Sequence, residues 1–227
     1  MVDALVESTT PAHDAARLVA AALRAGIASR GHAHLAIPGG SALEALAPLV
    51  RALGAEAWRH VRVTWTDERC VPVSSPDSNR GAAYARGLRQ PPPAMELPLW
   101  LDGETFEHAV TRVRAGLAVS FRMRLDAVLL GMGEDGHVAS LFPGSPALGA
   151  VGGVVAVHDA PKAPADRVTL TPDLLSTARV TVILATGARK RHAIRRLLAA
   201  DTDIPASRLS RSWLVTDVTA IDSREAS

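Results

Sequence analysis

The sequence predicts an α/β fold: a Rossmann-like, mostly parallel β-sheet flanked by helices on both faces. Short apolar runs alternate with longer amphipathic stretches along the 227 residues, which is typical of βαβ units. Three of the runs end in glycine-containing turns, at Gly39-Gly40, at residues 131–136 and at Gly187. Because ligands of parallel sheets bind beyond the carboxyl ends of the strands, we expect the functional site at the edge where these turns meet.

The helices are predicted from caps, prolines and amphipathic periodicity. Thr10 is a candidate cap and Pro11 suits the first position of a helix, so the opening segment is interpreted as one helix with no strand before it. Gly187 interrupts the chain before the last helix. The expected helices are residues 10–29, 41–53, 79–88, 104–120 and 188–199.

The strands are predicted from short apolar runs bounded by glycine, proline or polar residues. Segment 89–98 holds four of the 15 prolines and is interpreted as a connection without an element of its own. The expected strands are residues 34–37, 61–65, 127–130, 154–157 and 180–185, with a sixth candidate at 213–215.

Composition narrows the class of protein. With 48% hydrophobic and 21% charged residues the balance is globular, and the length favours a single domain over residues 1–227. No run approaches a membrane span, and the start lacks a basic, apolar leader. The single cysteine, Cys70, excludes an internal disulfide and a cysteine-rich zinc site, so a reducing, cytoplasmic compartment is expected. The net charge of +2 argues against a nucleic-acid or membrane partner.

Only two of the 25 basic residues are lysines, Lys162 and Lys190. Arginine is a wide planar fork and lysine a compact point charge, so a lysine kept in such an arginine-rich chain hints at a site where arginine would not serve. Chance survival explains the same count, and composition alone leaves both interpretations open.

Two motifs at strand ends could bind an anionic ligand. In Gly39-Gly40-Ser41 the glycines allow close approach and the following helix start offers free N–H groups, which suits phosphate. A strand-to-helix turn capped by Ser41 explains the same residues. Two carboxylates and an arginine, Asp67, Glu68 and Arg69, follow the next strand. They could bind sugar hydroxyls and phosphate, or form an ion-paired surface turn.

The glycine-rich run 131–136 leads into His137, with Asp135 two residues earlier. A histidine held beyond a strand end beside a carboxylate is suited to general-base work near neutral pH. A structural histidine is the alternative, since the chain has eight, but the glycines favour close approach of a ligand. Lys190 lies in the first turn of a helix, where acidic residues are normally preferred, so an anionic ligand would explain it better than the helix does.

Taken in order, these motifs resemble 6-phosphogluconolactonases. The run Leu-Gly-Met-Gly-Glu-Asp-Gly-His-Val-Ala-Ser-Leu-Phe-Pro-Gly at 130–144 is similar to the family's signature, and so is Asp-Glu-Arg-Cys-Val-Pro at 67–72, followed by Ser78 and Asn79. The Gly-Gly-Ser, Arg-Val-Thr-Leu-Thr and Gly-Ala-Arg-Lys blocks keep the family's order over about residues 34–217. Pro38, Ala42 and Leu43 depart from the Ser-Gly-Gly-Ser-Thr-Pro pattern, so phosphate binding is expected to rest more on the backbone and Ser41.

The resemblance implies hydrolysis of 6-phospho-D-glucono-1,5-lactone to 6-phospho-D-gluconate in the oxidative pentose phosphate pathway, without metal or organic cofactor. A monomer or weak homodimer acting on a small sugar-phosphate lactone is expected. His137 is expected to be the base, and Asp135 and Arg69 are the other expected catalytic residues. Whether Asp135 orients His137 or binds a sugar hydroxyl stays open. The expected substrate- and phosphate-binding residues are Gly39, Gly40, Ser41, Asp67, Arg69, Asn79, Gly133, Arg167 and Lys190. Which of Arg69, Arg167 and Lys190 binds phosphate and which stabilises the oxyanion stays open.

Two alternatives are a glucosamine-6-phosphate deaminase and a non-catalytic sugar-phosphate sensor. The deaminases resemble the same scaffold but typically carry Asp-Glu-Tyr at the second motif and Asn-Glu-Pro after the histidine. This chain has Arg69 at the first of these places and Leu-Phe-Pro at 141–143 in the second, so the carboxylate that assists the deaminase histidine is absent. A sensor would need a DNA-binding segment or a partner, and the one helix expected before the first strand leaves little room for such a segment. A sensor would also have no need of His137.

Overall fold

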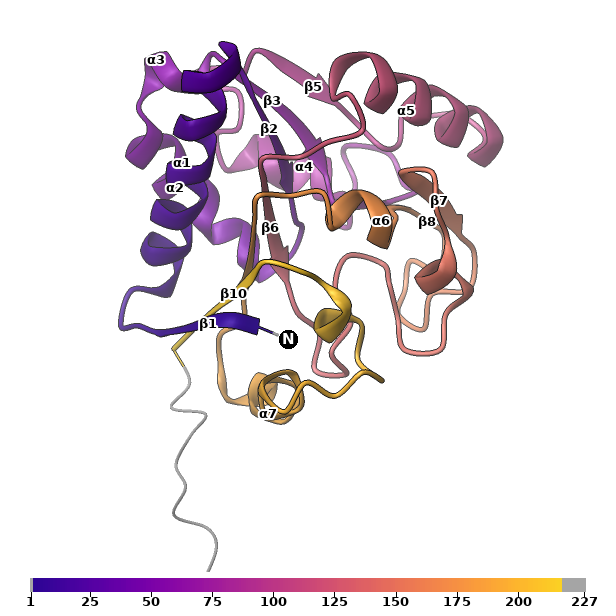
Figure 1. Cartoon of the computed structure of the whole chain (residues 1–227). Coiled ribbons are helices and arrows are strands. Elements are labelled where there is room, and N and C mark those ends of the chain that lie inside the picture. The colour runs from indigo at the N-terminus through magenta and orange to yellow at the C-terminus, as the bar shows by residue number, and fades with distance from the viewer. Residues whose placement is uncertain (1, 218–227) are drawn as a thin grey trace, which may run out of the picture.

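The computed structural model describes residues 2–217 and is built on a seven-stranded sheet (Figure 1). The strand order is β1-β10-β9-β6-β2-β3-β5, and every neighbouring pair in it is parallel, which confirms the predicted class. Its strands are β1 (Val2–Glu7), β2 (Ala33–Ile37), β3 (Val61–Trp65), β5 (Met95–Leu97), β6 (Ala127–Gly131), β9 (Val180–Leu184) and β10 (Ser212–Thr216). All five residues of β2 are buried, because a strand in the middle of such a sheet is covered on both faces.

Helices cover both faces of the sheet. Figure 1 shows α1 and α2 side by side on one side and α5 on the other. The α-helices are α1 (Pro11–Arg30), α2 (Leu46–Leu53), α3 (Ala55–Trp58), α4 (Asn79–Ala85), α5 (Phe106–Ser120), α6 (Pro172–Leu175) and α7 (Arg191–Leu198). Four 3₁₀ turns accompany them: η1 (Ser41–Ala45), η2 (Pro146–Gly149), η3 (Ala188–Lys190) and η4 (Pro205–Arg208). No helix within residues 2–217 is long and apolar enough to cross a membrane.

A second, three-stranded antiparallel sheet lies beside the first, and the sequence did not predict it. It consists of β4 (Asp67–Arg69), β8 (Arg167–Leu170) and β7 (Val154–Val157), in that order. The predicted strand 154–157 exists, but its assignment to the parallel sheet was wrong. Thr66 alone separates β3 from β4, so the chain passes from one sheet into the other within one residue. This passage brings the 167–170 segment beside Asp67.

Two further expectations are corrected at the sheet edges. Segment 89–98 is more than a connection, because β5 pairs with β3 directly after the prolines. The opening segment is not a single helix, because residues 2–7 form β1 and pair with β10. Each is an edge strand with one neighbour, and β1 is only partly buried, so neither shows the continuous apolar run of a central strand.

Candidate active site

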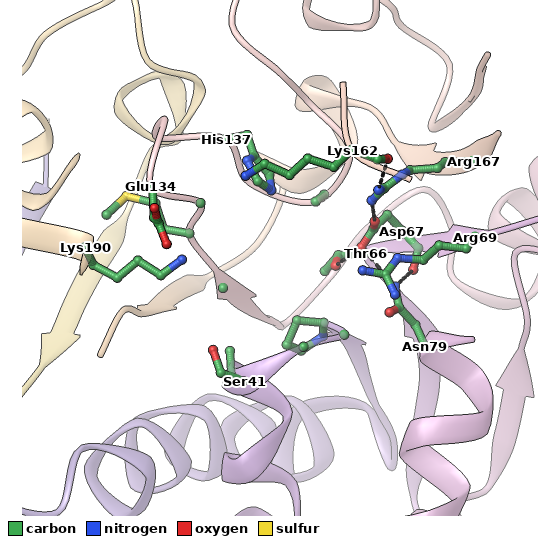
Figure 2. Close-up of a pocket in the computed structure, with 18 residues that line it drawn as sticks. Ser41, Thr66, Asp67, Arg69, Asn79, Glu134, His137, Lys162, Arg167 and Lys190 are labelled. Atoms are coloured by element: carbon green, nitrogen blue, oxygen red, sulfur yellow. Dashed lines mark hydrogen bonds and ion pairs between the residues drawn. The ribbon is translucent and has the colours of Figure 1, made fainter. Parts of the chain in front are cut away.

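One cleft beyond the carboxyl ends of β2, β3 and β6 gathers almost all of the predicted site residues (Figure 2). Those that line it are Gly39, Gly40, Ser41, Asp67, Arg69, Asn79, Gly133, His137, Arg167 and Lys190. Asp135 does not line the cleft but is hydrogen-bonded to His137. The expectation that the glycine turns after three strands meet at one edge is therefore confirmed.

The turn after β6 is folded so that Asp135 and His137 face each other. The N–H of Gly133 donates to the carbonyl of His137 at 2.8 Å, and the N–H of Gly136 donates to the carbonyl of Gly133 at 3.1 Å. Gly136 has a φ of 82°, a left-handed conformation that glycine adopts without strain. Within this closed turn, Nδ1 of His137 lies 2.5 Å from Oδ1 of Asp135.

The surroundings of His137 favour its neutral form. Its side chain is only 18% exposed, and its ring packs against Phe142 with a centroid separation of 4.6 Å. Burial lowers the pKa of His137, although Asp135 opposes the effect. Burial would raise the pKa of Asp135, but its hydrogen bonds with His137 and the nearby charges of His137 and Lys162 together lower that pKa. Asp135 is thus a carboxylate that accepts the Nδ1 proton, and Nε2 is left as the proton acceptor of a neutral imidazole.

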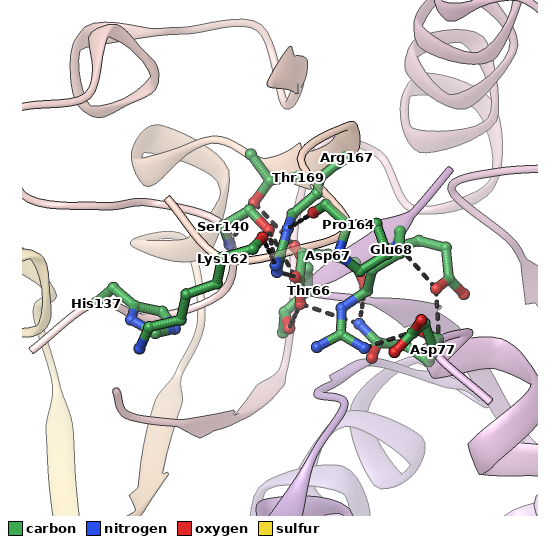
Figure 3. A network of polar contacts seen from close by, with 12 residues as sticks. Thr66, Asp67, Glu68, Asp77, His137, Ser140, Lys162, Pro164, Arg167 and Thr169 are labelled. Atoms are coloured by element: carbon green, nitrogen blue, oxygen red, sulfur yellow. Dashed lines mark hydrogen bonds and ion pairs between the residues drawn. The ribbon is translucent and has the colours of Figure 1, made fainter. Parts of the chain in front are cut away.

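Asp67 is held by a buried polar network (Figure 3). The hydroxyl of Ser140 donates to Oδ2 of Asp67 at 2.7 Å, and Nη1 of Arg167 lies 3.8 Å from the same oxygen. Arg167 also donates to the carbonyls of Pro164 at 2.9 Å and Lys162 at 2.8 Å. Because Arg167 is 4% exposed and bound on several sides, it braces the loop that carries Lys162.

Hydrogen bonds of Glu68 and Asn79 hold the segment after β3 in place. The Glu68 carboxyl accepts hydrogen bonds from the backbone N–H groups of Arg69 at 2.9 Å, Asn79 at 2.7 Å and Arg80 at 2.6 Å. Burial nevertheless raises the pKa of Glu68 to about 7. The alternative of an exposed, ion-paired turn is therefore wrong for Asp67 and Glu68, which are 6% and 3% exposed.

Asn79 also ties this segment to the glycine loop. Its side-chain amide donates to the carbonyl of Asp67 at 2.8 Å. A Cβ added to Gly39 would lie 1.8 Å from the amide oxygen of Asn79, so this glycine is required by close packing. Arg69, which donates to the carbonyl of Asp77 at 2.7 Å, is held beside the same loop.

The glycine loop itself does not use Ser41 as a cap. Gly40, with a φ of 63°, precedes the 3₁₀ turn η1, and the side chain of Ser41 makes no capping hydrogen bond. Ser41 is exposed and lines the cleft.

Lys190 enters the cleft from the turn after β9. Figure 2 shows its ammonium group extended over the cleft above Ser41. The side chain is half-buried, which lowers its pKa, and it forms no ion pair within residues 2–217. Its neighbour Arg189 instead pairs with Glu134, the Nε and Oε1 atoms being 3.5 Å apart. A half-buried cation that makes no direct ion pair among the described residues suits an anionic ligand.

Sequence reasoning left out several polar residues at the site, among them Lys162 and Ser140. Lys162 lines the cleft with its Nζ 3.9 Å from Oδ1 of Asp135, and its rarity as a lysine was the available signal. Ser140 lies inside the recognised 130–144 run, but its bond to Asp67 depends on contacts between distant segments. Cys70 is half-buried, and burial raises the pKa of its thiol to about 12. Among residues 2–217, no three or more histidine, cysteine, aspartate or glutamate side chains are grouped to hold a metal ion.

The parallel sheet and its cationic cleft define the class: an α/β protein with a hydrogen-bonded histidine–aspartate pair at the carboxyl edge of its strands. Residues 7–216 match the family described as glucosamine-6-phosphate isomerases/6-phosphogluconolactonase, and the chain belongs to this family.

Curated relatives and solved structures agree with this assignment. The chain is 34% identical over 216 residues to a 6-phosphogluconolactonase of Synechocystis sp., covering 89% of this chain and 86% of the relative. It is 34% identical to a 6-phosphogluconolactonase of Pseudomonas putida, with 90% and 85% covered. The crystal structure of a 6-phosphogluconolactonase from Shewanella baltica superposes with a TM-score of 0.81 at 25% identity, over 95% of this chain and 96% of that one. A monomeric glucosamine-6-phosphate deaminase shares the fold, with a TM-score of 0.79 at 20% identity over 96% and 98%.

Proposed function

We propose that the protein hydrolyses 6-phospho-D-glucono-1,5-lactone to 6-phospho-D-gluconate, a step of the oxidative pentose phosphate pathway. The observation that carries the proposal is the environment of His137, which has one carboxylate partner, Asp135, and an apolar ring, Phe142, on its flank. Leu141 and Phe142, 1% and 3% exposed, occupy the positions where a deaminase would place a second carboxylate. The 34% identity to two named 6-phosphogluconolactonases supports the same reaction.

The cations of the cleft fall into two groups that suit the two ends of the substrate. Arg69 lines the cleft together with the glycine loop, so this side would bind the phosphate with backbone N–H groups and a guanidinium. Lys162 lies beside Asp135, and Lys190 lies near enough to Glu134 and Lys162 for their charges to act on it. We assign this lysine side to the carbonyl oxygen of the lactone, where negative charge develops during attack.

The chemical step then follows from the hydrogen bonding of His137. Nε2 takes a proton from a water molecule while the water oxygen attacks the lactone carbonyl carbon. The carbonyl oxygen becomes an oxyanion beside the lysines, and Asp135 stabilises the imidazolium through Nδ1. When the bond to the ring oxygen breaks, His137 returns the proton to that oxygen. General-base catalysis of this kind contributes about 10²–10⁴-fold.

The direct test is hydrolysis of freshly generated 6-phosphogluconolactone by the purified protein and by its His137→Ala variant, each corrected for spontaneous ring opening. The proposal predicts fast turnover by the wild type and a loss of at least a hundredfold in the variant, in keeping with the contribution of a general base. Ammonia release from glucosamine 6-phosphate, measured in parallel, should be absent. Deamination without lactone hydrolysis would replace the proposal with the deaminase. If the protein shows neither activity, the sensor is favoured instead.

The second part of the proposal concerns the domain organisation, oligomeric state and cellular compartment of the enzyme. We place a single domain over residues 1–227, acting as a monomer or weak homodimer in the cytoplasm. Cys70 as the single cysteine is in keeping with a reducing compartment. Sedimentation analysis over a range of concentrations tests the oligomeric state, and a stable tetramer would contradict it.

A further inference from the structure

A second cleft lies at the other end of the sheet. The proposed active site occupies the carboxyl ends of β2 and β6, whereas this cleft is formed where α1 runs into β2 and α5 runs into β6, at the amino ends of both strands. The residues that line it are Arg30, His32, His34, Phe121, Arg122 and Arg124. No step proposed for the lactonase reaction uses any of them.

The cleft carries an excess of positive charge. Asp126, the carboxylate of this cluster, is fully buried and already neutralised by Arg30, at 2.6 Å, and Arg179, at 3.4 Å. Arg122 and Arg124 are exposed, and neither side chain makes a hydrogen bond or ion pair within residues 2–217.

Some of these arginines are explained by their place at a helix C-terminus, where a positive charge is favoured, but not all of them are. Cations are favoured at helix C-termini, and Arg30 stands in the last turn of α1 while Arg62 donates to the carbonyl of Ser120 at the end of α5. Both of these arginines have protein partners. The guanidinium groups of Arg122 and Arg124, in contrast, have no such partner within residues 2–217.

The floor of the cleft is built from packed rings. His34 is 3% exposed, and its ring lies between those of His32 and Phe121, with centroid separations of 5.0 and 4.9 Å. Nδ1 of His34 donates to the carbonyl of Arg124 at 2.9 Å, which fixes the backbone of that arginine. Nε2 of His34 is buried and has no hydrogen-bond partner in the described part of the chain, so the floor holds an unused polar atom.

The turn that presents the two free arginines is strained. Arg122 and Met123 have φ values of 52° and 49°, a left-handed conformation that costs energy for residues other than glycine. The conformation packs Met123 against the hydrophobic core and leaves the arginines on either side of it exposed. Two consecutive strained residues are typical of segments under a functional constraint.

We propose that this cleft is a second anion site, which binds a phosphate dianion, either free or as a phosphomonoester. Guanidinium groups match the geometry of phosphate oxygens in bidentate contacts, and two of them stand unpaired at the rim. Arg30, which shares its charge with Asp126, lies on the wall of the cleft beside His32. The site is separate from the lactonase cleft, so occupancy of one can be measured without the other.

The experiment follows the histidine ring signals by NMR while inorganic phosphate, or glycerol 3-phosphate, is added to the full chain. His32 reports the second cleft and His137 reports the proposed active site. We expect saturable shifts of His32 in the wild type with either ligand, and the tighter of the two identifies the source. In an Arg122→Gln/Arg124→Gln variant the affinity seen at His32 should fall at least tenfold, while the response of His137 stays unchanged.

A charge-matched control separates a site from general attraction. Arg51→Gln/Arg86→Gln removes two exposed arginines that line neither cleft, and it should leave the His32 titration unchanged. The proposal is overturned if His32 shifts equally with chloride at the same ionic strength, does not saturate, or is indifferent to loss of Arg122 and Arg124. Failure of the lactonase proposal would appear at His137 and in turnover, not at His32.

Discussion

Gly133 and His137 approach each other so closely that no side chain fits between them. A Cβ built on Gly133 would lie 2.0 Å from Nδ1 of His137 and 2.3 Å from Oδ1 of Asp135. Gly133→Ala should therefore separate the pair and lower kcat for lactone hydrolysis about 10²-fold or more, the range of a lost general base. Steady-state kinetics on fresh lactone measure the effect.

Gly149→Ala is the matched control for that substitution. Nothing lies within 4 Å of a Cβ at Gly149, so the variant should keep wild-type turnover and stability. Wild-type kcat in Gly133→Ala would show that the hydrogen bond between Asp135 and His137 does not matter for the reaction.

Acidification should inactivate the enzyme through His137. The base works in its neutral form, and burial lowers its pKa below the ordinary 6.5. The kcat/KM should therefore be flat above pH 6.5 and fall about tenfold per unit below an inflection that lies under that value. Asp135→Asn removes the group that holds this pKa up, so the inflection should move further down. An inflection above 6.5 in the wild type would contradict the assignment.

Lys190→Arg tests whether a compact cation is needed in the cleft. The half-buried ammonium would be replaced by a broader guanidinium, so we expect kcat/KM to fall about tenfold or more, a loss of roughly 1.4 kcal/mol in transition-state stabilisation. Arg189→Lys, at a side chain that is 88% exposed, is the control and should leave kcat/KM unchanged. Equal kinetics in both variants would mean that charge alone matters at residue 190.

Ser140→Ala should destabilise the protein from within the polar network. The hydroxyl is fully buried and donates to Asp67, so its loss leaves a buried carboxylate oxygen short of a donor, at a cost of about 1–3 kcal/mol. Urea unfolding followed by circular dichroism gives the free energy of unfolding. Ser210→Ala, at an exposed hydroxyl, should change it little, and an equal loss in both would refute the role given to Ser140.

The sequence predicted the central strands because burial on both faces makes them continuous apolar runs, as in β2 and β6. It did not predict β1 or β5, which are edge strands with one partner each. Nor did it predict β4 and β8, three and four residues long, whose pairing sets Asp67 opposite Thr169. Strands this short depend on distant segments for their register, and no local periodicity encodes that.

The site likewise contains local features that the sequence predicts and features that depend on contacts between distant segments. The pairing of Asp135 with His137 could be predicted because it is local, two residues apart in a glycine turn. The bracing role of Arg167 could not, since it arises from the meeting of β4 with β8 and from the carbonyls of the 162–164 loop. Arg167 was expected to bind substrate; it lines the cleft as expected, and it also has several protein partners there.

The pairing of β1 with β10 also constrains how the chain can fold. Residues 2–7 are the first described segment to be synthesised, yet their neighbour in the sheet, Ser212–Thr216, is the last. While the polypeptide is still growing from the ribosome, β1 has no native strand to pair with, and the core over β9 and β10 stays open at that edge. Closure of the sheet is therefore a late event in folding, whereas the contacts of α1 with β2 and of β2 with β3 join segments that are made early.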